Sequence, residues 1–158
     1  CALKADGPVA LLLTRQNLKP YDAETAKNVN VERGAFVVSD DEDFGMILLA
    51  TGSEVSLALE AAELLRAEGA KIRVVSMPSQ ELFLQQDFDY QEEVLPSYCG
   101  AVVSIEAAST FGWERFTGLE GLNIGLDHFG ASAPYKLLFK EYGFTAENVF
   151  ETAKKVIK

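Results

Sequence analysis

The chain has 158 residues, of which 48% are apolar and 24% are charged, a composition typical of one globular domain. No apolar run approaches the roughly 20 residues of a membrane helix, which excludes a membrane span. The net charge is −10, with 14 Lys and Arg against 24 Asp and Glu, and such a surface repels a nucleic-acid backbone.

Cysteine usage and the first residues indicate a cytosolic protein. Cys1 and Cys99 are too few for a disulfide framework, and no cluster of Cys and His has the spacing of zinc ligands. The opening residues, CALKADGP, lack the apolar core of a secretory signal. They also lack an initiator Met, and we expect the chain to be a segment of a longer polypeptide.

The first predicted element is a buried strand over Val9–Leu13, in the apolar run VALLLT. Residues 20–34 are polar, begin with proline and end with glycine, and they predict a linker. The charge balance changes at the same place. Residues 1–34 hold five basic and four acidic side chains, whereas residues 35–158 hold nine and twenty. We therefore expect a domain boundary near residue 34.

From residue 35 onward, predicted strands alternate with predicted helices. Apolar runs predict strands over residues 35–39, 46–50, 71–77, 101–106 and 122–126. Helices are expected after Thr51 as far as a stop at Gly69, over 79–95, over 133–142, and over 146–157 with Thr145 as the cap, and a short helix or loop is expected around 112–116. This alternation predicts an α/β sandwich with a largely parallel sheet.

The tetrapeptide from Thr51 to Glu54 follows a strand and opens a helix, a place where open α/β sheets often bind anions. A capping box explains the pattern better, with Thr51 and Glu54 satisfying the first free N–H groups. A single Gly falls short of a nucleotide-binding motif, and Glu54 itself would occupy the positive end of the helix. We expect the cap, and an anion near Ser53 is the alternative.

Three other polar features carry no specific chemical signal. His128 is the only histidine and follows a strand, but no nucleophile motif accompanies it, so we expect a solvated or capping role. Asp40–Asp43 lacks the spaced ligands of a metal loop and resembles a solvated turn. Glu106 ends a strand, and the pattern does not distinguish a functional acid from an ordinary helix-start acid.

Arg15 is the best candidate for a binding residue. It follows the predicted strand in a segment with little other charge, and Gln16 and Asn17 stand beside it. A planar guanidinium binds phosphate or carboxylate through two parallel hydrogen bonds. A structural salt bridge is the competing explanation, and both stay open from the residues alone. The chain supplies no catalytic set to accompany this candidate.

Four motifs in order resemble the transketolase family, and more narrowly the last third of its polypeptide. They are TRQN at 14–17, LLATGSEV at 48–55, RVVSMPS at 73–79 and HFGASAP at 128–134. The closing EYGFTAENV also fits, so the resemblance covers nearly the whole chain.

The resemblance implies that residues 1–34 are the end of the pyrimidine-binding domain plus a linker. Residues 35–158 would be the C-terminal domain, a three-layer α/β sandwich with a mixed, mostly parallel sheet of about five strands. It further implies transfer of a two-carbon ketol unit between sugar phosphates in the pentose phosphate pathway, by a cytoplasmic homodimer that uses thiamine diphosphate and a divalent metal (Mg or Ca). The Arg of the family's [ST]RQN motif helps to hold the substrate phosphate, and the matching residue is Arg15. The family often has Arg where His128 stands, so no role is carried over to His128.

Most of the family's catalytic machinery has no counterpart in this sequence, including the GDG segment that binds metal and diphosphate. We therefore expect no catalytic, cofactor-binding or metal-binding residue in this chain, an isolated chain without activity, and a dimer-supporting role for its C-terminal domain. Two alternatives stay open. One is a related thiamine diphosphate enzyme, such as dihydroxyacetone synthase or deoxyxylulose-phosphate synthase. The other is a free-standing α/β binding or regulatory module that uses the helix start at Ser53.

Overall fold

One five-stranded sheet organises the fold in a computed structural model that describes residues 2–23 and 25–157; Cys1 lies outside them. The strands are β1 (Phe36–Ser39), β2 (Met46–Ala50), β3 (Ile72–Ser76), β4 (Val102–Ile105) and β5 (Leu122–Ile124). Their order across the sheet is β1-β3-β2-β4-β5. Strand β1 runs antiparallel to β3, and all other neighbours are parallel. The mixed, mostly parallel sheet of five strands is therefore confirmed.

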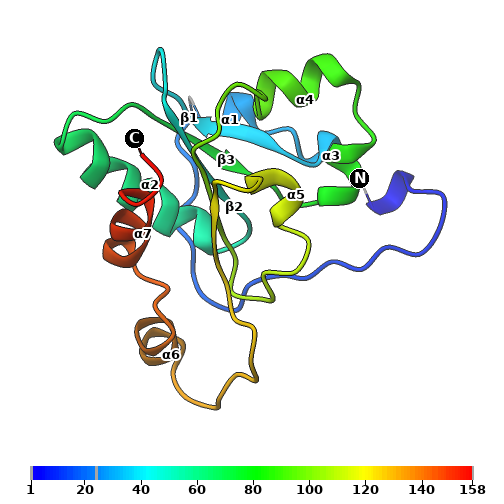
Figure 1. Cartoon of the computed structure of the whole chain (residues 1–158). Coiled ribbons are helices and arrows are strands. Elements are labelled where there is room, and N and C mark those ends of the chain that lie inside the picture. The colour runs from blue at the N-terminus through cyan, green and yellow to red at the C-terminus, as the bar shows by residue number, and fades with distance from the viewer. Residues whose placement is uncertain (1, 24, 158) are drawn as a thin grey trace.

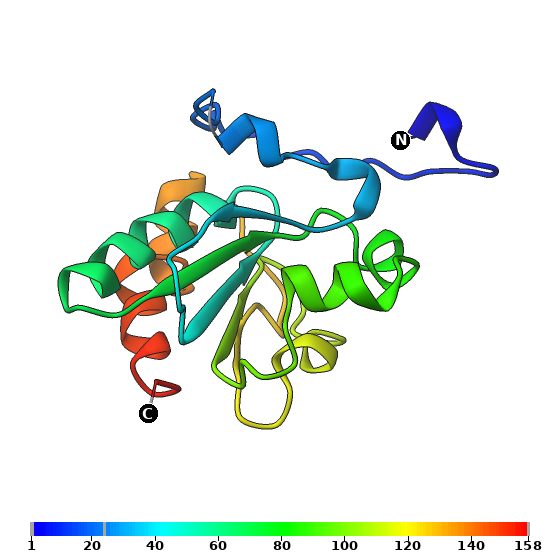
Figure 2. The same cartoon turned by 90° about the horizontal axis from the view of Figure 1, so that it is seen from above.

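Helices cover both faces of the sheet and make three layers (Figure 2). One face carries α2 (Glu54–Ala67) and α7 (Ala146–Ala153), and the other carries α3 (Gln80–Leu84), α4 (Phe88–Val94) and α5 (Glu114–Thr117). Figure 1 shows α6 (Tyr135–Glu141) below α7 at the bottom of the view, and the short helices η1 (Ala2–Lys4), α1 (Thr25–Asn28) and η2 (Val31–Arg33) precede the sheet in the chain. No helix in the described part of the chain combines the length and hydropathy needed to cross a bilayer.

Strand β2 lies at the centre, and its side chains alternate between two buried clusters. Met46, Leu48 and Ala50 face the cluster that contains α2 and α7, whereas Ile47 and Leu49 face the cluster with α4 and α5. All five are at most 1% exposed. A strand buried on both faces needs apolar residues at every position, which explains the unbroken run MILLA.

The predicted strand over Val9–Leu13 is wrong. This segment is extended but has no strand pairing, and Leu12 and Leu13 are 91% and 83% exposed. A strand needs a neighbour to satisfy its backbone groups, and the part of the chain that the structure describes supplies none to it. The apolar pattern therefore identifies residues suited to a buried strand, but here they remain on the surface.

One helix prediction and one linker prediction need correction, while two helix-end predictions are confirmed. The single helix over residues 79–95 is divided into α3 and α4, because Asp87 accepts a hydrogen bond from the Tyr90 N–H (2.9 Å) and starts a new helix. The linker over residues 20–34 contains α1 and η2. Thr145 caps α7 as expected, and Gly69 follows α2 with a φ of 89°.

Candidate functional site

The segment around Arg15 lies against the loop that joins β2 to α2. Gln16 Nε2 donates a hydrogen bond to Ser53 Oγ at 2.7 Å. A Cβ built on Gly52, which has a φ of 58°, would lie 3.6 Å from the Thr14 methyl group, so Thr14 packs over this glycine. The TRQN and TGSE motifs are thus neighbours in space, at the end of the sheet where β2 stops (Figure 1).

A third motif reaches the same place. Arg15, Gln16 and Asn17 line an open hollow of about 470 Å³ together with Ala133 and Tyr135, at the start of α6. The hollow therefore joins the TRQN segment to the end of the GASAP motif, more than 110 positions along the chain. Arg15, Asn17 and Tyr135 offer a guanidinium, an amide and a phenol, which are suited to binding an oxygen-rich anion rather than to acid–base chemistry, while the amide of Gln16 is bonded to Ser53.

The turn before α2 is not the capping box that the sequence predicts. Ser53 is the residue at the helix cap, yet its side chain makes no capping hydrogen bond. Its hydroxyl instead accepts from Gln16 and donates to Glu54 Oε1. The other carboxylate oxygen of Glu54 accepts from the Ala107 N–H at 3.1 Å. The side chains of this turn therefore connect neighbouring segments instead of closing the helix end.

Glu54 is a buried carboxylate, only 5% exposed. Burial raises the pKa of Glu54 because it penalises the charged form, while the hydrogen bonds from Ser53 and Ala107 oppose the shift. The nearby charge of Glu106 raises this pKa further. The local pattern indicates a helix cap for Glu54 and gives no sign of its burial, which follows from the close approach of the loop after β4 to the start of α2.

Two other carboxylates hold the loop after β4, and one of them, Asp127, comes from the loop after β5. Glu106 accepts from Trp113 Nε1 at 2.7 Å and thereby anchors the buried indole. Asp127 accepts from Ser109 Oγ (3.0 Å) and from both the N–H (2.8 Å) and the hydroxyl (2.7 Å) of Thr110. These bonds lower the pKa of Asp127. Sequence analysis did not single out Asp127, although a carboxylate directly after a strand was a usable signal.

His128 follows Asp127 and is exposed. Its ring lies edge-on to Tyr142 with 5.2 Å between the ring centres, and Nδ1 lies 2.9 Å from the Phe129 carbonyl oxygen. His128 is not among the residues that line the hollow at Arg15. Its contacts therefore give it no part in that site.

The acidic turn at Asp40–Asp43 is more than a solvated loop, which corrects the expectation for it. Asp40 makes two hydrogen bonds with Arg73, at 2.9 and 2.7 Å. Asp41 Oδ2 accepts from Arg66 Nε and from the Ile72 N–H, both at 2.8 Å. Arg73 of the RVVSMPS motif is therefore committed to a structural contact. The turn ties the first two strands to β3 and α2.

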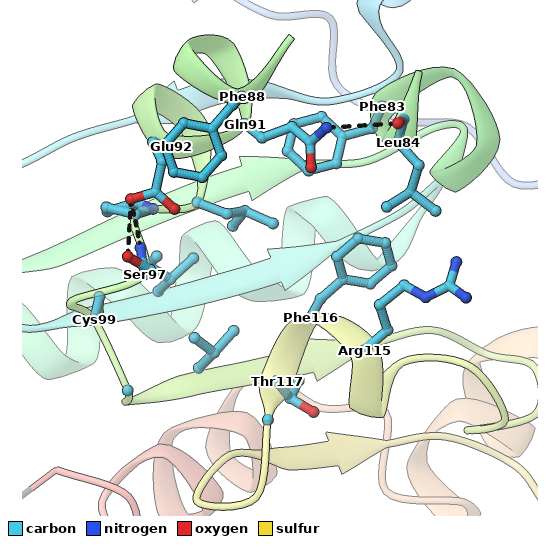
Figure 3. A pocket seen from close by; sticks show the side chains of 16 residues that line it. Phe83, Leu84, Phe88, Gln91, Glu92, Ser97, Cys99, Arg115, Phe116 and Thr117 are labelled. Atoms are coloured by element: carbon cyan, nitrogen blue, oxygen red, sulfur yellow. Dashed lines mark hydrogen bonds between the residues drawn. The ribbon is translucent and has the colours of Figure 1, made fainter. Parts of the chain in front are cut away.

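A second hollow lies on the face of the sheet that α3, α4 and α5 cover, between α4 and α5 (Figure 3). It has a volume of about 400 Å³, and Phe83, Phe88 and Phe116 make it largely apolar. Its acid, Glu92, is held by the N–H (3.0 Å) and hydroxyl (2.9 Å) of Ser97. Because the carboxylate is engaged locally, this groove offers a binding surface but no pair of groups for catalysis.

No group of three or more His, Cys, Asp or Glu side chains gathers around one point within residues 2–23 and 25–157. Those residues therefore do not provide a ready-made set of ligands for a divalent metal and its diphosphate. Arg15 and its neighbours remain the candidate site of this chain.

Comparison with known proteins identifies the family. The model of the transketolase-like C-terminal domain matches residues 34–145. Transketolase 1 of Pasteurella multocida is 46% identical over 158 residues, which cover 98% of this chain and 24% of that protein. The chain thus spans about a quarter of the length of such relatives.

Solved structures agree. Transketolase from Leishmania mexicana is 44% identical with a TM-score of 0.73, over 81% of this chain and 19% of that one. A transketolase from Pichia stipitis, in complex with sedoheptulose-7-phosphate, is 38% identical with a TM-score of 0.76, over 90% of this chain and 20% of that one. The chain belongs to the transketolase family and corresponds to the C-terminal portion of its members.

Proposed function

We propose that this chain serves as the C-terminal part of a transketolase, and that Arg15 binds the phosphate group of the sugar substrate. The complete enzyme would transfer a two-carbon ketol unit between sugar phosphates in the pentose phosphate pathway. The observation that carries the proposal is the hollow shared by Arg15, Gln16 and Asn17 with the end of the GASAP motif. A relative of this chain was solved with a sugar phosphate, which supports that class of substrate.

Arg15 is available for an anion. Among the residues that the structure describes, no carboxylate pairs with it, whereas Arg33, Arg66 and Arg73 each pair with an aspartate. The competing explanation of Arg15 as a structural salt bridge therefore lacks a partner in the described chain. A guanidinium that is exposed beside two amides can donate several hydrogen bonds to one phosphate.

The mechanistic value of this contact lies in its distance from the reacting atoms. Binding energy from a remote phosphate can hold the reacting carbonyl of a sugar in place and so lower the entropic part of the barrier. The overall charge of −10 does not prevent this, because a ligand in the hollow meets the local field of one nearby cation. Arg15 therefore acts by binding and orientation.

We also propose that the complete enzyme uses thiamine diphosphate with a divalent metal, which together supply the nucleophilic carbon for ketol transfer. The described residues offer no cluster of acidic or histidine ligands for that group, so its binding is assigned to the rest of the protein. The part of this chain is to bind and position substrate, and the chain alone should be inactive.

The domain assignment is part of the same proposal. Residues 1–34 would complete a pyrimidine-binding domain and continue as a linker, and residues 35–158 would form the C-terminal domain of a cytoplasmic homodimer. Leu11, Leu12 and Leu13 are at least 69% exposed. Three consecutive exposed leucines are costly in water, and a neighbouring sheet in the complete protein would bury them.

The test is Arg15→Ala in the complete enzyme, assayed with a phosphorylated donor ketose and with a donor that lacks phosphate. One or two lost charge-assisted hydrogen bonds should raise KM for the phosphorylated donor roughly 10- to 100-fold. KM for the unphosphorylated donor should change by less than about twofold, because no phosphate contact exists to lose. An equal rise for both donors would contradict the phosphate role.

A further inference from the structure

Few hydrogen bonds hold the Arg15 segment in place. Between residues 6–20 and the rest of the described chain, the hydrogen bond from Gln16 Nε2 to Ser53 Oγ is the only one that forms. The segment has no helix or strand of its own. The position of Arg15 therefore depends on the residue next to it.

The group that receives this bond is itself fixed. Ser53 is 7% exposed, and its hydroxyl has a single proton, which it donates to Glu54. The oxygen lone pairs of Ser53 remain as acceptors, which selects a donor such as the Gln16 amide. Because Glu54 also accepts from the Ala107 N–H, the chain of bonds ends on backbone at the start of the loop after β4.

This series of hydrogen bonds sets which atom of each pair donates, as well as where the Gln16 side chain lies. With Glu54 ionised, each bond in the series Gln16–Ser53–Glu54–Ala107 has a set donor and acceptor, because a carboxylate can only accept. Ser53 and Glu54 stand at the start of α2, the longest helix of the described chain, which packs on the central sheet. The hydrogen bond from Gln16 to Ser53, the tether, therefore fixes an extended segment to a rigid part of the domain.

We propose that Gln16, held by the buried Ser53–Glu54 pair, is a positioning residue that keeps Arg15 aimed at the substrate phosphate. This inference rests on the proposed phosphate role of Arg15. Gln16 acts through Arg15 and need not touch the substrate. Without the tether, the segment must be ordered each time a phosphate binds, and that cost appears in the affinity for phosphorylated substrates.

The experiment uses the complete enzyme loaded with its cofactor and compares Gln16→Leu, Ser53→Ala, Arg15→Ala and the double variant Arg15→Ala/Gln16→Leu. Leucine keeps the volume of Gln16 but cannot donate. Ser53→Ala removes the acceptor without removing a helix cap, because the Ser53 side chain makes no capping bond. Thr145→Ala is the matched control, since it removes a real cap on α7 and makes no contact with the tether.

Gln16→Leu and Ser53→Ala should each raise KM for the phosphorylated donor about three- to tenfold, the effect of one lost hydrogen bond. They should leave KM for the unphosphorylated donor and kcat within about twofold. In the double variant, Gln16→Leu should add nothing to Arg15→Ala, because a tether has no function once the tethered guanidinium is gone.

The outcomes separate this inference from the proposed function. If Arg15→Ala is specific for the phosphorylated donor while Gln16→Leu is silent, the tether is refuted and the phosphate role stands. If Gln16→Leu lowers affinity for both donors equally, or if its effect is additive with Arg15→Ala, positioning is also refuted. If Arg15→Ala shows no preference for the phosphorylated donor, the phosphate role itself fails.

Discussion

Asp41→Asn should destabilise the chain through the loss of a partly buried charge contact. One carboxylate oxygen of Asp41 accepts from Arg66 Nε and from the Ile72 N–H, both at 2.8 Å. A charge-assisted hydrogen bond contributes about 1.5–3 kcal/mol when shielded from water. The side chains of Asp41 and Arg66 are 28% and 22% exposed, so solvent screening reduces this value. We expect a loss of about 2 kcal/mol in the free energy of unfolding, or about 4–8 °C in Tm.

The dependence on pH follows from the direction of the pKa shift. Partial burial raises the pKa of Asp41, but the bonds from Arg66 and Ile72 and the charge of Arg66 outweigh it and lower the pKa below its ordinary value of 3.8. The stability from this carboxylate is therefore fully present above pH 3.8 and is lost as the pH falls through the lowered pKa. The difference in the free energy of unfolding between the wild-type chain and Asp41→Asn should be constant near neutrality and should become smaller in strong acid.

Glu63→Gln is the control for this experiment. Glu63 also bonds Arg66 at 2.8 Å, but its side chain is 75% exposed, so its loss should change stability by less than about 0.5 kcal/mol. Urea unfolding is followed by circular dichroism and by the fluorescence of the buried Trp113, at neutral pH and at pH values below 3.8. Equal losses of unfolding free energy in the two variants would refute the reasoning. So would a difference between the wild-type chain and Asp41→Asn that stays the same in acid.

Two further predictions concern backbone space and a buried charge. Gly34→Ala should lower the free energy of urea unfolding by about 2–4 kcal/mol, because its φ is 84° and a new Cβ would clash with the Phe83 backbone nitrogen. Gly45→Ala, with nothing within 4 Å of a new Cβ, should be nearly neutral, and similar losses for the two variants would refute the steric argument. Burial raises the pKa of Glu54, so the wild-type chain should lose stability relative to Glu54→Gln as the pH rises above 4.5 and through that raised pKa. A difference in unfolding free energy between the wild-type chain and Glu54→Gln that does not change with pH would contradict this prediction.

Much of the fold could be predicted because periodicity and packing agree in the sheet. All five strands from residue 35 onward lie within one or two residues of their predicted ends, since each is a mainly apolar run with glycine, proline or a charged residue close to both ends. The same signal failed at Val9–Leu13. An apolar run indicates that a segment is suited to a buried strand, but it does not show whether a neighbouring strand is present to pair with it.

The candidate site was harder to predict, because burial of polar residues depends on tertiary neighbours. Thr51 and Glu54 have the spacing of a capping box, and the local pattern gives no sign that the backbone of Ala107 supplies a better donor. Asp41 likewise appears as one acid among four until Arg66 and the Ile72 N–H approach it from distant parts of the chain. In both cases the deciding contact spans at least 25 residues, beyond the reach of a local motif.

The parallel sheet explains why motifs scattered along this chain meet at one edge. Parallel neighbours end on the same side, so the residues after β2, β4 and β5 gather there, and the TRQN segment passes the same edge and contacts the residues after β2. Most of the motif side chains at this edge already have partners, as Gln16, Ser53 and Glu54 show. Arg15 differs, because it lines the hollow without a partner in the described chain. If Arg15 binds the substrate phosphate as proposed, substitutions of the paired residues should weaken that binding by misplacing the guanidinium, and only a change of Arg15 itself should remove its charge.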